Sequence, residues 1–278
     1  MEVNNMLEYL KKVIHNMPTD WLRLTTHRLD IYNESLAKTQ FLDAFETLYQ
    51  QNNADTSALE TLPTAYDYIR LGHPLSSVLE WTIANLHQIK PSHVISFSSQ
   101  TIPVLAVLRK NLFENKNTQI AYTGHLPQGF DAEIIKNIYG YSFELIKVEH
   151  IDNIPAFQGS TIYISQEANL ETMQLFENID FYISLHKNLG SILIVNGKQN
   201  ENYVSEIQHV RRRETIAMTP ADCLVALKAL IHHKPVESDN KLVEANKTSV
   251  LNSINKITET TTKALVASSG LSIQYAIL

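Results

Sequence analysis

The chain has 278 residues, 44% hydrophobic and 19% charged, which is enough for a sizeable core. Its formal net charge of −6 is spread thinly along the chain, so no basic patch indicates that the protein binds nucleic acid. We interpret the basic cluster Arg211-Arg212-Arg213 as a solvated helix face. The single cysteine, Cys223, excludes an internal disulfide and favours a cytoplasmic location. We expect neither a signal peptide nor a membrane partner, because no apolar run approaches the roughly 18 residues of a membrane span.

The first part of the chain, residues 1–60, predicts a helical N-terminal segment. Apolar residues recur at helical spacing in Met6–Ile14 and Phe41–Tyr49, whereas Gln50–Glu60 is polar and predicts a loop. Pro63–Pro74 predicts an extended, ordered loop.

A helix is predicted at Val78–Ile89, ended by Pro91. Ser76 and Ser77 are its expected caps. Glu80 lies early in this helix, where the helix dipole favours an anion.

Short apolar runs then alternate with helical patterns. The predicted strands are His93–Phe97, Ile120–Tyr122, Phe143–Val148, Thr161–Ser165 and Asp180–Leu185. The predicted helices between them are Ile102–Leu112, Asp131–Tyr139 and Leu170–Phe176. This alternation predicts an α/β fold with a mostly parallel sheet covered on both faces.

The C-terminal part begins with a second apolar run, Ile192–Val195, which a polar turn with Gly190 separates from Phe181–Leu185. We therefore predict two buried strands joined at a turn. Further helices are predicted at Val204–Glu214, at Ala221–His232 after Pro220, and at Val243–Ile257, followed by a final strand at Leu271–Ile277.

Lys187 follows the first of these two strands, and ligands of α/β sheets collect outside the carboxyl ends of strands. A partly desolvated lysine there is a candidate amine nucleophile, because burial lowers its pKa. The alternative is a solvated turn lysine. His186 is either a general base or an ordinary histidine at the end of a turn, and the same alternatives apply to His125. No spacing predicts a metal site.

A series of motifs runs along the chain from Tyr68 onward. They are Tyr68-Ile69-Arg70-Leu71-Gly72-His73-Pro74, Leu79-Glu80 with Ile83-Ala84-Asn85-Leu86, Phe97-Ser98-Ser99, Ser184-Leu185-His186-Lys187, Thr219-Pro220-Ala221-Asp222 and Ser269-Gly270-Leu271. In this order they resemble the pyridoxal-phosphate-dependent Cys/Met metabolism family, the cystathionine synthases and lyases. Residues 1–60 do not share the resemblance.

The resemblance implies a role for each matching residue. Lys187 would hold pyridoxal 5′-phosphate as a Schiff base, while Tyr68 and Arg70 would reach the phosphate of a neighbouring subunit. The hydroxyls that would lie at the phosphate belong to Ser98, Ser99 and Ser184. A homodimer or homotetramer and an amino-acid ligand are implied. From the residues alone, Arg70 can equally be a surface arginine, Tyr68 a packed loop aromatic, and the serines structural.

The main departure from the family lies between Ile164-Ser165-Gln166-Glu167 and the lysine. The family has there a strand ending in an aspartate that pairs with the pyridinium nitrogen, and Ala168–Ile179 leaves room for one short helix only. Asp180 matches the residue that opens the lysine strand and does not fill that role. Without a carboxylate at the ring nitrogen, the cofactor is a poorer electron sink.

Other departures affect the contacts to phosphate, ring and substrate. Gln100 replaces a glycine of the phosphate cup, and Pro127 replaces a tyrosine that stacks on the ring. Gln274 stands in the last strand, which lacks the arginine that clamps the substrate carboxylate.

These observations predict a fold-type-I, pyridoxal-phosphate-transferase-like large domain at residues 61–233 and a shortened C-terminal small domain at 234–278. The predicted function is that of a divergent, catalytically impaired family member that retains the cofactor through Lys187. The alternatives are an active lyase or synthase of sulfur amino acids, and a non-catalytic oligomeric binding scaffold. Whether the chain is an enzyme stays open at this point.

Overall fold

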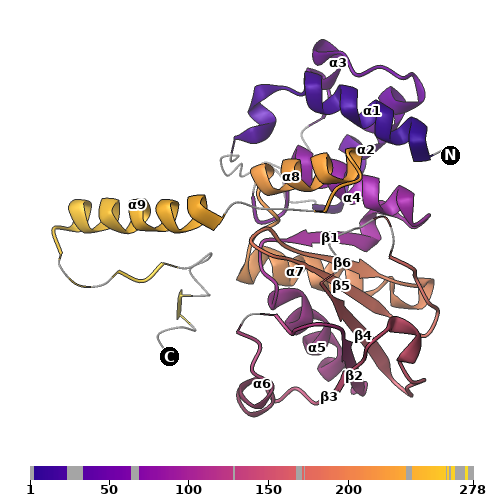
Figure 1. Cartoon of the computed structure of the whole chain (residues 1–278), viewed down its shortest axis with the longest axis vertical. Helices are drawn as coiled ribbons and strands as arrows, with labels where there is room; N and C mark the ends of the chain where they lie inside the picture. The colour runs from indigo at the N-terminus through magenta and orange to yellow at the C-terminus, as the bar shows by residue number, and fades with distance from the viewer. Residues whose placement is uncertain are drawn as a thin grey trace.

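A six-stranded sheet in the order β1-β6-β5-β4-β2-β3 forms the centre of the computed structural model (Figure 1). The structure describes residues 3–23, 34–63, 69–127, 129–166, 171, 173–235, 240–260, 262, 264–266 and 273–274. The strands are β1 (Val94–Phe97), β2 (Thr118–Tyr122), β3 (Glu144–Lys147), β4 (Ser160–Ser165), β5 (Phe181–His186) and β6 (Gly190–Val195).

The strand directions confirm the mostly parallel sheet. β5, β4, β2 and β3 pair in parallel, one after another. β1 and β5 both run antiparallel to β6, so β6 alone opposes the common direction in this sheet of the described residues. β5 and β6 are the two buried strands joined at a turn that the sequence predicts.

Helices cover both faces of the sheet, as expected for this alternation. On one face lie α1 (Val3–Asn16), α2 (Glu34–Gln50), α4 (Pro74–Leu86) and α8 (Pro220–Ile231). On the other face lie α5 (Ile102–Phe113) and α7 (Tyr203–Glu214). The strand period of two divides the side chains of β5 between the two cores, with Tyr182 in the first and Phe181 and Ile183 in the second.

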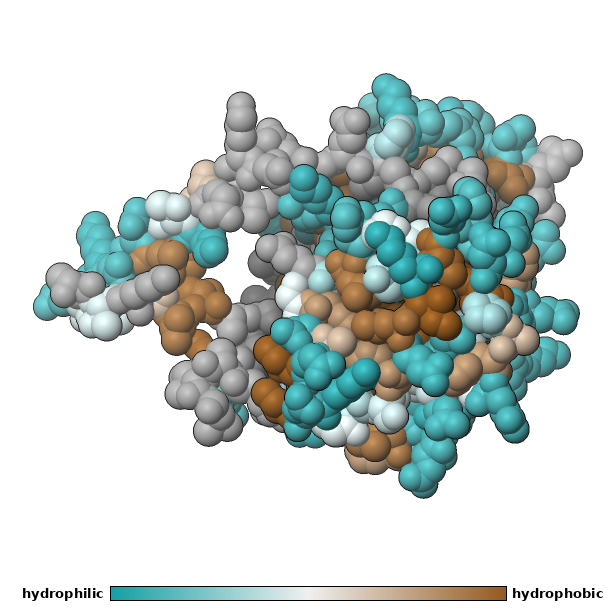
Figure 2. Space-filling model, turned by 60° about the horizontal axis from the view of Figure 1, so that its bottom comes forward, coloured by the Kyte–Doolittle hydropathy of each residue, from teal (hydrophilic) through white to brown (hydrophobic). Residues whose placement is uncertain are grey.

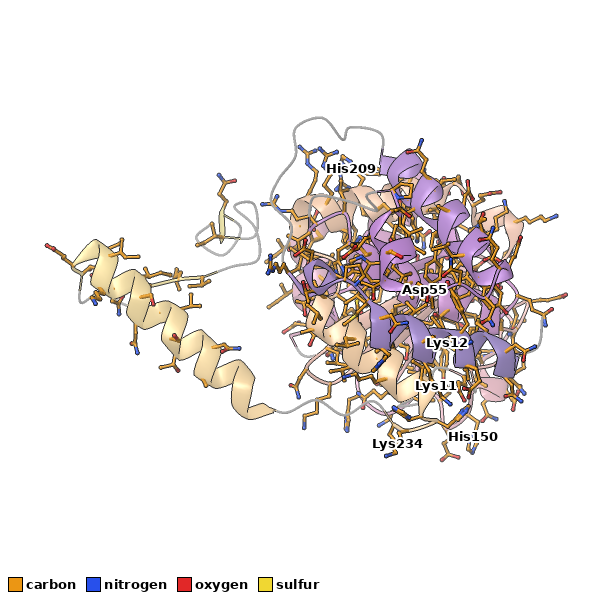
Figure 3. The ribbon with its side chains drawn as sticks, turned by 90° about the horizontal axis from the view of Figure 1, so that it is seen from above. Lys11, Lys12, Asp55, His150, His209 and Lys234 are labelled. Carbon is orange, nitrogen blue, oxygen red and sulfur yellow. The ribbon has the colours of Figure 1, made fainter. Side chains whose placement is uncertain are left out.

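The N-terminal helices share the core of α4 and α8. Phe45 of α2 packs edge-on against Trp81 of α4, with ring centroids 5.2 Å apart, and Tyr9 of α1 packs on Phe45 at 5.8 Å. Seen from above in Figure 3, Lys11 and Lys12 lie on α1, and Asp55 precedes α3 (Thr56–Glu60). The division at residue 60 stays a prediction.

Two further α-helices occur among the described residues, α6 (Ala132–Tyr139) and α9 (Asn240–Thr258). The predicted ends of α6 are confirmed, because the Asp131 side chain accepts from Ile134 N at 3.0 Å and Gly140 takes a left-handed conformation. α9 extends away from the body in Figures 1 and 3. No helix among the described residues is long and apolar enough to cross a membrane.

A buried ionic cluster connects three helices with β1. Glu80 contacts Lys38 Nζ at 2.5 Å and Arg211 Nη1 at 3.1 Å, and it accepts from Ser96 N at 2.8 Å. Two sequence expectations are therefore wrong. Glu80 lies in the middle of α4 against two cations rather than near the helix start, and Arg211 belongs to the core rather than to a solvated helix face.

The predicted start of α4 is also wrong, although the Ser76 side chain does take part in its cap. His73 is the N-cap, its side chain accepts from Ser76 N at 3.2 Å, and Ser76 Oγ accepts from His73 N at 2.9 Å. The helix therefore begins at Pro74 and ends at Leu86 rather than Ile89. Pro91 opens a short 3₁₀ turn instead of ending the helix.

Three other element predictions differ from the structure. Thr56–Glu60 is helical rather than a loop, because Leu59 buries its side chain and the Asp55 carbonyl accepts from Ala58 and Leu59. Residues 171 and 173–176 are not helical, since Phe176 O accepts from the Asn196 side chain at 2.9 Å. Residues 273–274 are helical rather than extended, and the rest of that predicted strand lies outside the described residues.

Candidate functional site

A polar cleft of about 660 Å³ lies at the carboxyl ends of β1 and β5, beside the start of α5. Its walls are built by Ser98, Ser99, Gln100, Thr101, Leu126, Gln166, Leu185, His186, Lys187, Asn188 and Gly190. The place is the one expected for a ligand site in an α/β sheet. Among the described residues, this cleft brings together Lys187, Ser98 and Ser99 of the predicted site.

The β5–β6 hairpin positions Lys187. His186 pairs with Gly190, so Lys187 lies in the loop between them, and Leu189 N donates to His186 O at 3.2 Å. Gly190 has φ +120°, and a Cβ there would lie 2.0 Å from Phe97 O, so only glycine lets the hairpin approach β1 this closely.

Lys187 is exposed at the tip of this hairpin. The expectation of a partly desolvated amine is therefore wrong for the single chain, because the loop carries the side chain beyond the buried end of β5. Of the two alternatives that the sequence left open, the single chain shows the solvated turn lysine, and this lysine borders the cleft.

His186 and Ser184 are both buried on β5. His186 Nε2 and Ser184 Oγ are 3.1 Å apart and share a hydrogen bond. Burial lowers the pKa of His186 to about 4, so the imidazole is neutral at pH 7. Ser184 is not among the residues that line the cleft. His125 is exposed, and its carbonyl accepts from the Gln166 side chain at 2.9 Å.

Ser98 and Ser99 lie at the cleft with their hydroxyls engaged inside the protein. Ser98 Oγ lies 3.2 Å from Thr215 Oγ1 and donates to Ile216 O at 3.3 Å. Ser99 Oγ accepts from Thr101 N at 3.3 Å and from Ile102 N at 3.2 Å. Ser99 therefore caps the first turn of α5.

Gln100 closes the gap between α5 and the hairpin. Its side-chain Nε2 donates to His186 O at 3.1 Å, and Ser191 Oγ donates to Ser99 O at 2.6 Å. The residue that stands in place of the expected glycine thus fastens the two walls of the cleft to each other.

The remaining predicted site residues lie elsewhere. Tyr68 is outside the described residues. Arg70 is half-buried and is not among the residues that line the cleft. Its segment is held by Ala217 N, which donates to Ile69 O at 3.2 Å, and by Arg211 Nη2, which donates to Leu71 O at 2.5 Å.

No Asp or Glu occurs among the described residues that line the cleft. β4 pairs directly with β5, so no strand separates them. Asp180 lies before the first residue of β5, where its carboxylate accepts from Thr161 N at 2.9 Å and from Asn200 Nδ2 at 2.8 Å. Both oxygens of Asp180 therefore hold backbone and side-chain groups of the fold. Glu167 lies outside the described residues.

Pyridoxal phosphate, which the resemblance implies, does not fit this cleft as a carbanion-stabilising cofactor. An amine is present in Lys187, but the described lining offers no carboxylate for the ring nitrogen. The hydroxyls of Ser98, Ser99 and Ser184 already have partners within the protein.

Sequence reasoning missed several residues of the cleft, namely Thr101, Leu126, Gln166 and Asn188. One signal for Gln166 was available, since it directly follows a predicted strand and so belongs to the same edge of the sheet as Lys187. Thr101, Leu126 and Asn188 lie in connecting loops, and no pattern in the sequence distinguishes them.

No family model matches the sequence, and no curated protein matches it. Among solved structures, cystathionine gamma-lyase from yeast has 12% identity and a TM-score of 0.46, covering 89% of this chain and 68% of that one. MetB from Corynebacterium glutamicum has 14% identity and a TM-score of 0.44, covering 80% of this chain. A putative O-acetylhomoserine (thiol)-lyase (metY) from Campylobacter jejuni, solved with N′-pyridoxyl-lysine-5′-monophosphate, has 13% identity and a TM-score of 0.42, covering 80% of this chain and 70% of that one.

The chain spans only 63% of the length of the Corynebacterium protein. The matched proteins are of the kind that the sequence motifs resemble. Similarity of this degree does not assign an activity to this chain.

Proposed function

We propose that the chain is a divergent relative of the Cys/Met metabolism enzymes in which elimination and replacement chemistry is impaired. The observation that carries this proposal is the lining of the cleft, where Lys187 is present and the described residues supply no carboxylate. A pyridoxal cofactor stabilises a carbanion when its ring nitrogen is protonated, and a neighbouring carboxylate is what holds that proton.

The hydrogen bonds around the cleft support the same proposal. Ser98 and Ser99 donate and accept within the protein, and Gln100 fastens the α5 side of the cleft to the hairpin. The polar groups of these residues therefore already have hydrogen-bond partners within the protein. Lys187 is the lining residue that offers a side-chain amine, and we propose that it takes up the cofactor weakly.

Absorption spectra and turnover assays test the proposal together. We expect the protein mixed with pyridoxal phosphate to show at most a weak visible band, lost in Lys187→Ala and kept in Lys198→Ala, an exposed lysine outside the cleft. We expect cystathionine and cysteine to release pyruvate or 2-oxobutyrate far below the ordinary range of roughly 1–1000 per second. Turnover within that range would instead establish an active lyase or synthase.

A second candidate function, a non-catalytic oligomeric scaffold, is favoured by exposed apolar side chains. Ile138 of α6 is 73% exposed and Ile257 of α9 is 81% exposed. Figure 2 shows brown apolar side chains gathered on the face that looks downward in Figure 1, and more of them on the protruding helix. Such surfaces are typical of sites that another protein surface covers.

Sedimentation velocity tests the scaffold. We expect a homodimer or homotetramer that dissociates on Ile257→Asp or Ile138→Asp. Asn252→Asp adds the same charge to an exposed polar position of α9 and should leave the assembly unchanged. A monomer for the unaltered chain would remove this candidate.

A further inference from the structure

The start of α5 has the surroundings of an anion site but no free donor in its first turn. A helix N-terminus binds anions through backbone N–H groups that lack partners within the helix. In α5, the N–H groups of Thr101 and Ile102 both point to Ser99 Oγ, at 3.3 and 3.2 Å. Pro103 has no N–H, and Val104 N donates to Thr101 O at 3.0 Å. Every N–H group of this first turn therefore has an internal acceptor or does not exist.

The neighbouring residues hold Ser99 in this capping position. Its carbonyl accepts from Ser191 Oγ at 2.6 Å, which ties it to the first residues of β6. The next side chain, Gln100, is tied to His186 O of the hairpin. An anion could reach the Thr101 and Ile102 amides only by displacing the Ser99 hydroxyl, so it would lose the contacts that usually hold a phosphate.

We infer that Ser99 is a specificity-determining residue of this cleft: its hydroxyl takes the place of an anionic ligand group, so Lys187 accepts small uncharged aldehydes about as well as phosphorylated ones. The inference rests on the proposed function, in which Lys187 is the reactive amine. Lys187 Nζ bonds to the aldehyde carbon, and the carbonyl oxygen leaves as water with two protons of the amine.

Pyridoxal and pyridoxal 5′-phosphate are matched probes, because they differ only in the phosphate. Each is titrated against the whole chain, the imine is reduced with borohydride, and the modification of Lys187 is measured by mass spectrometry. For the unaltered protein, we expect half-saturating concentrations within about threefold of each other, a difference in binding free energy well below that of one charged hydrogen bond. A preference of about a hundredfold for the phosphorylated probe would overturn the inference.

Ser99→Ala releases the two amides and is expected to raise the preference for pyridoxal phosphate over pyridoxal by about tenfold, the gain of one hydrogen bond to a charged group. Ser98→Ala is the matched control, because Ser98 Oγ faces Ile216 rather than α5. Ser99→Thr keeps a hydroxyl and is expected to keep the unaltered ratio, even if Ser99→Ala folds poorly. An unchanged ratio in folded Ser99→Ala, or a changed ratio in Ser98→Ala, contradicts the inference.

The inference on Ser99 and the proposed function can fail independently of each other. The proposed function fails if the unaltered chain turns over cystathionine or cysteine at an ordinary rate, whichever probe it prefers. The inference on Ser99 fails if the unaltered chain prefers the phosphorylated probe by about a hundredfold, or if folded Ser99→Ala keeps the unaltered ratio, whether or not any turnover is found. Absence of labelling by both probes also overturns the inference, because Lys187 would then accept no aldehyde.

Discussion

Two lysines of this chain show how differently the fold can treat the same side chain. Lys38 is 5% exposed, and its amine contacts Glu80 at 2.5 Å and the Pro91 carbonyl at 2.9 Å. Lys187 is exposed at the tip of the β5–β6 hairpin. Of these two amines, the desolvated one lies inside a structural cluster and the accessible one borders the cleft.

The buried amine of Lys38 and the exposed amine of Lys187 differ in whether they are available for chemistry. Burial lowers the pKa of Lys38, although Glu80 acts in the opposite direction. Burial alone would raise the pKa of Glu80, but the charges of Lys38 and Arg211 outweigh it and lower the pKa instead. An amine whose N–H groups all point to fixed acceptors inside the protein is not available to bind a ligand. An exposed amine can contact a ligand.

The largest effect is expected from Glu80→Gln, which leaves Lys38 and Arg211 buried without a counter-charge. Breaking a buried ion pair by removing one partner costs about 4 kcal/mol of the free energy of unfolding. Urea unfolding followed by circular dichroism measures this loss. If the loss were below about 1 kcal/mol, the cluster would not stabilise the fold.

Glu201→Gln is the matched control for that substitution. Glu201 pairs with Lys90 at 2.6 Å, but both side chains are more than half exposed. Solvent screens such a pair, so no measurable loss of stability is expected. An equal loss in both variants would show that burial does not determine the effect.

Acid is expected to produce the next largest effect per residue, through the buried histidines His73, near the ionic cluster, and His186, near the cleft. Burial lowers the pKa of His73 and of His186 to about 4, from an ordinary 6.5. The unfolded chain then binds protons between about pH 6.5 and 4 that the folded chain does not, so stability falls as the pH falls through this window. The expected loss at pH 4 is about 3 kcal/mol for each histidine.

Thermal unfolding at pH 7, 5.5 and 4.5 measures this dependence. His186→Gln is expected to flatten it in part, because His186 no longer titrates whereas His73 and His93, whose pKa burial also lowers, still do. His150→Gln removes an exposed histidine and should leave the pH dependence unchanged. Equal slopes in all three proteins would show that His186 is not responsible.

Much of the fold could be predicted from the sequence, because periodicity and capping are local. The helix predicted at Asp131–Tyr139 agrees with α6 to within one residue, and the strand–helix alternation yields the sheet. The direct pairing of β4 with β5 is consistent with the short segment between these strands, whose length can be seen in the sequence.

The surroundings of single charges could not be predicted, because their partners are distant in the chain. Lys38 meets Glu80 across 42 residues, and Arg211 meets Glu80 across 131. Ser99 illustrates a different limit. Its motif predicts a hydroxyl at the cleft, but whether that hydroxyl faces a ligand or the backbone depends on the geometry of the first turn of α5.

The smallest effects test the two lysines directly. Lys38→Met keeps an unbranched apolar chain but leaves Glu80 with Arg211 as its one cationic partner among the described residues, and we expect a loss of about 2 kcal/mol of the free energy of unfolding. Lys187→Met removes an exposed amine, and we expect a change within about 0.5 kcal/mol. In aldehyde labelling the order should reverse, because Lys187 reacts and Lys38 does not. Similar stability losses in both variants, or faster labelling of Lys38, would contradict the assignment of one lysine to the core and the other to the cleft.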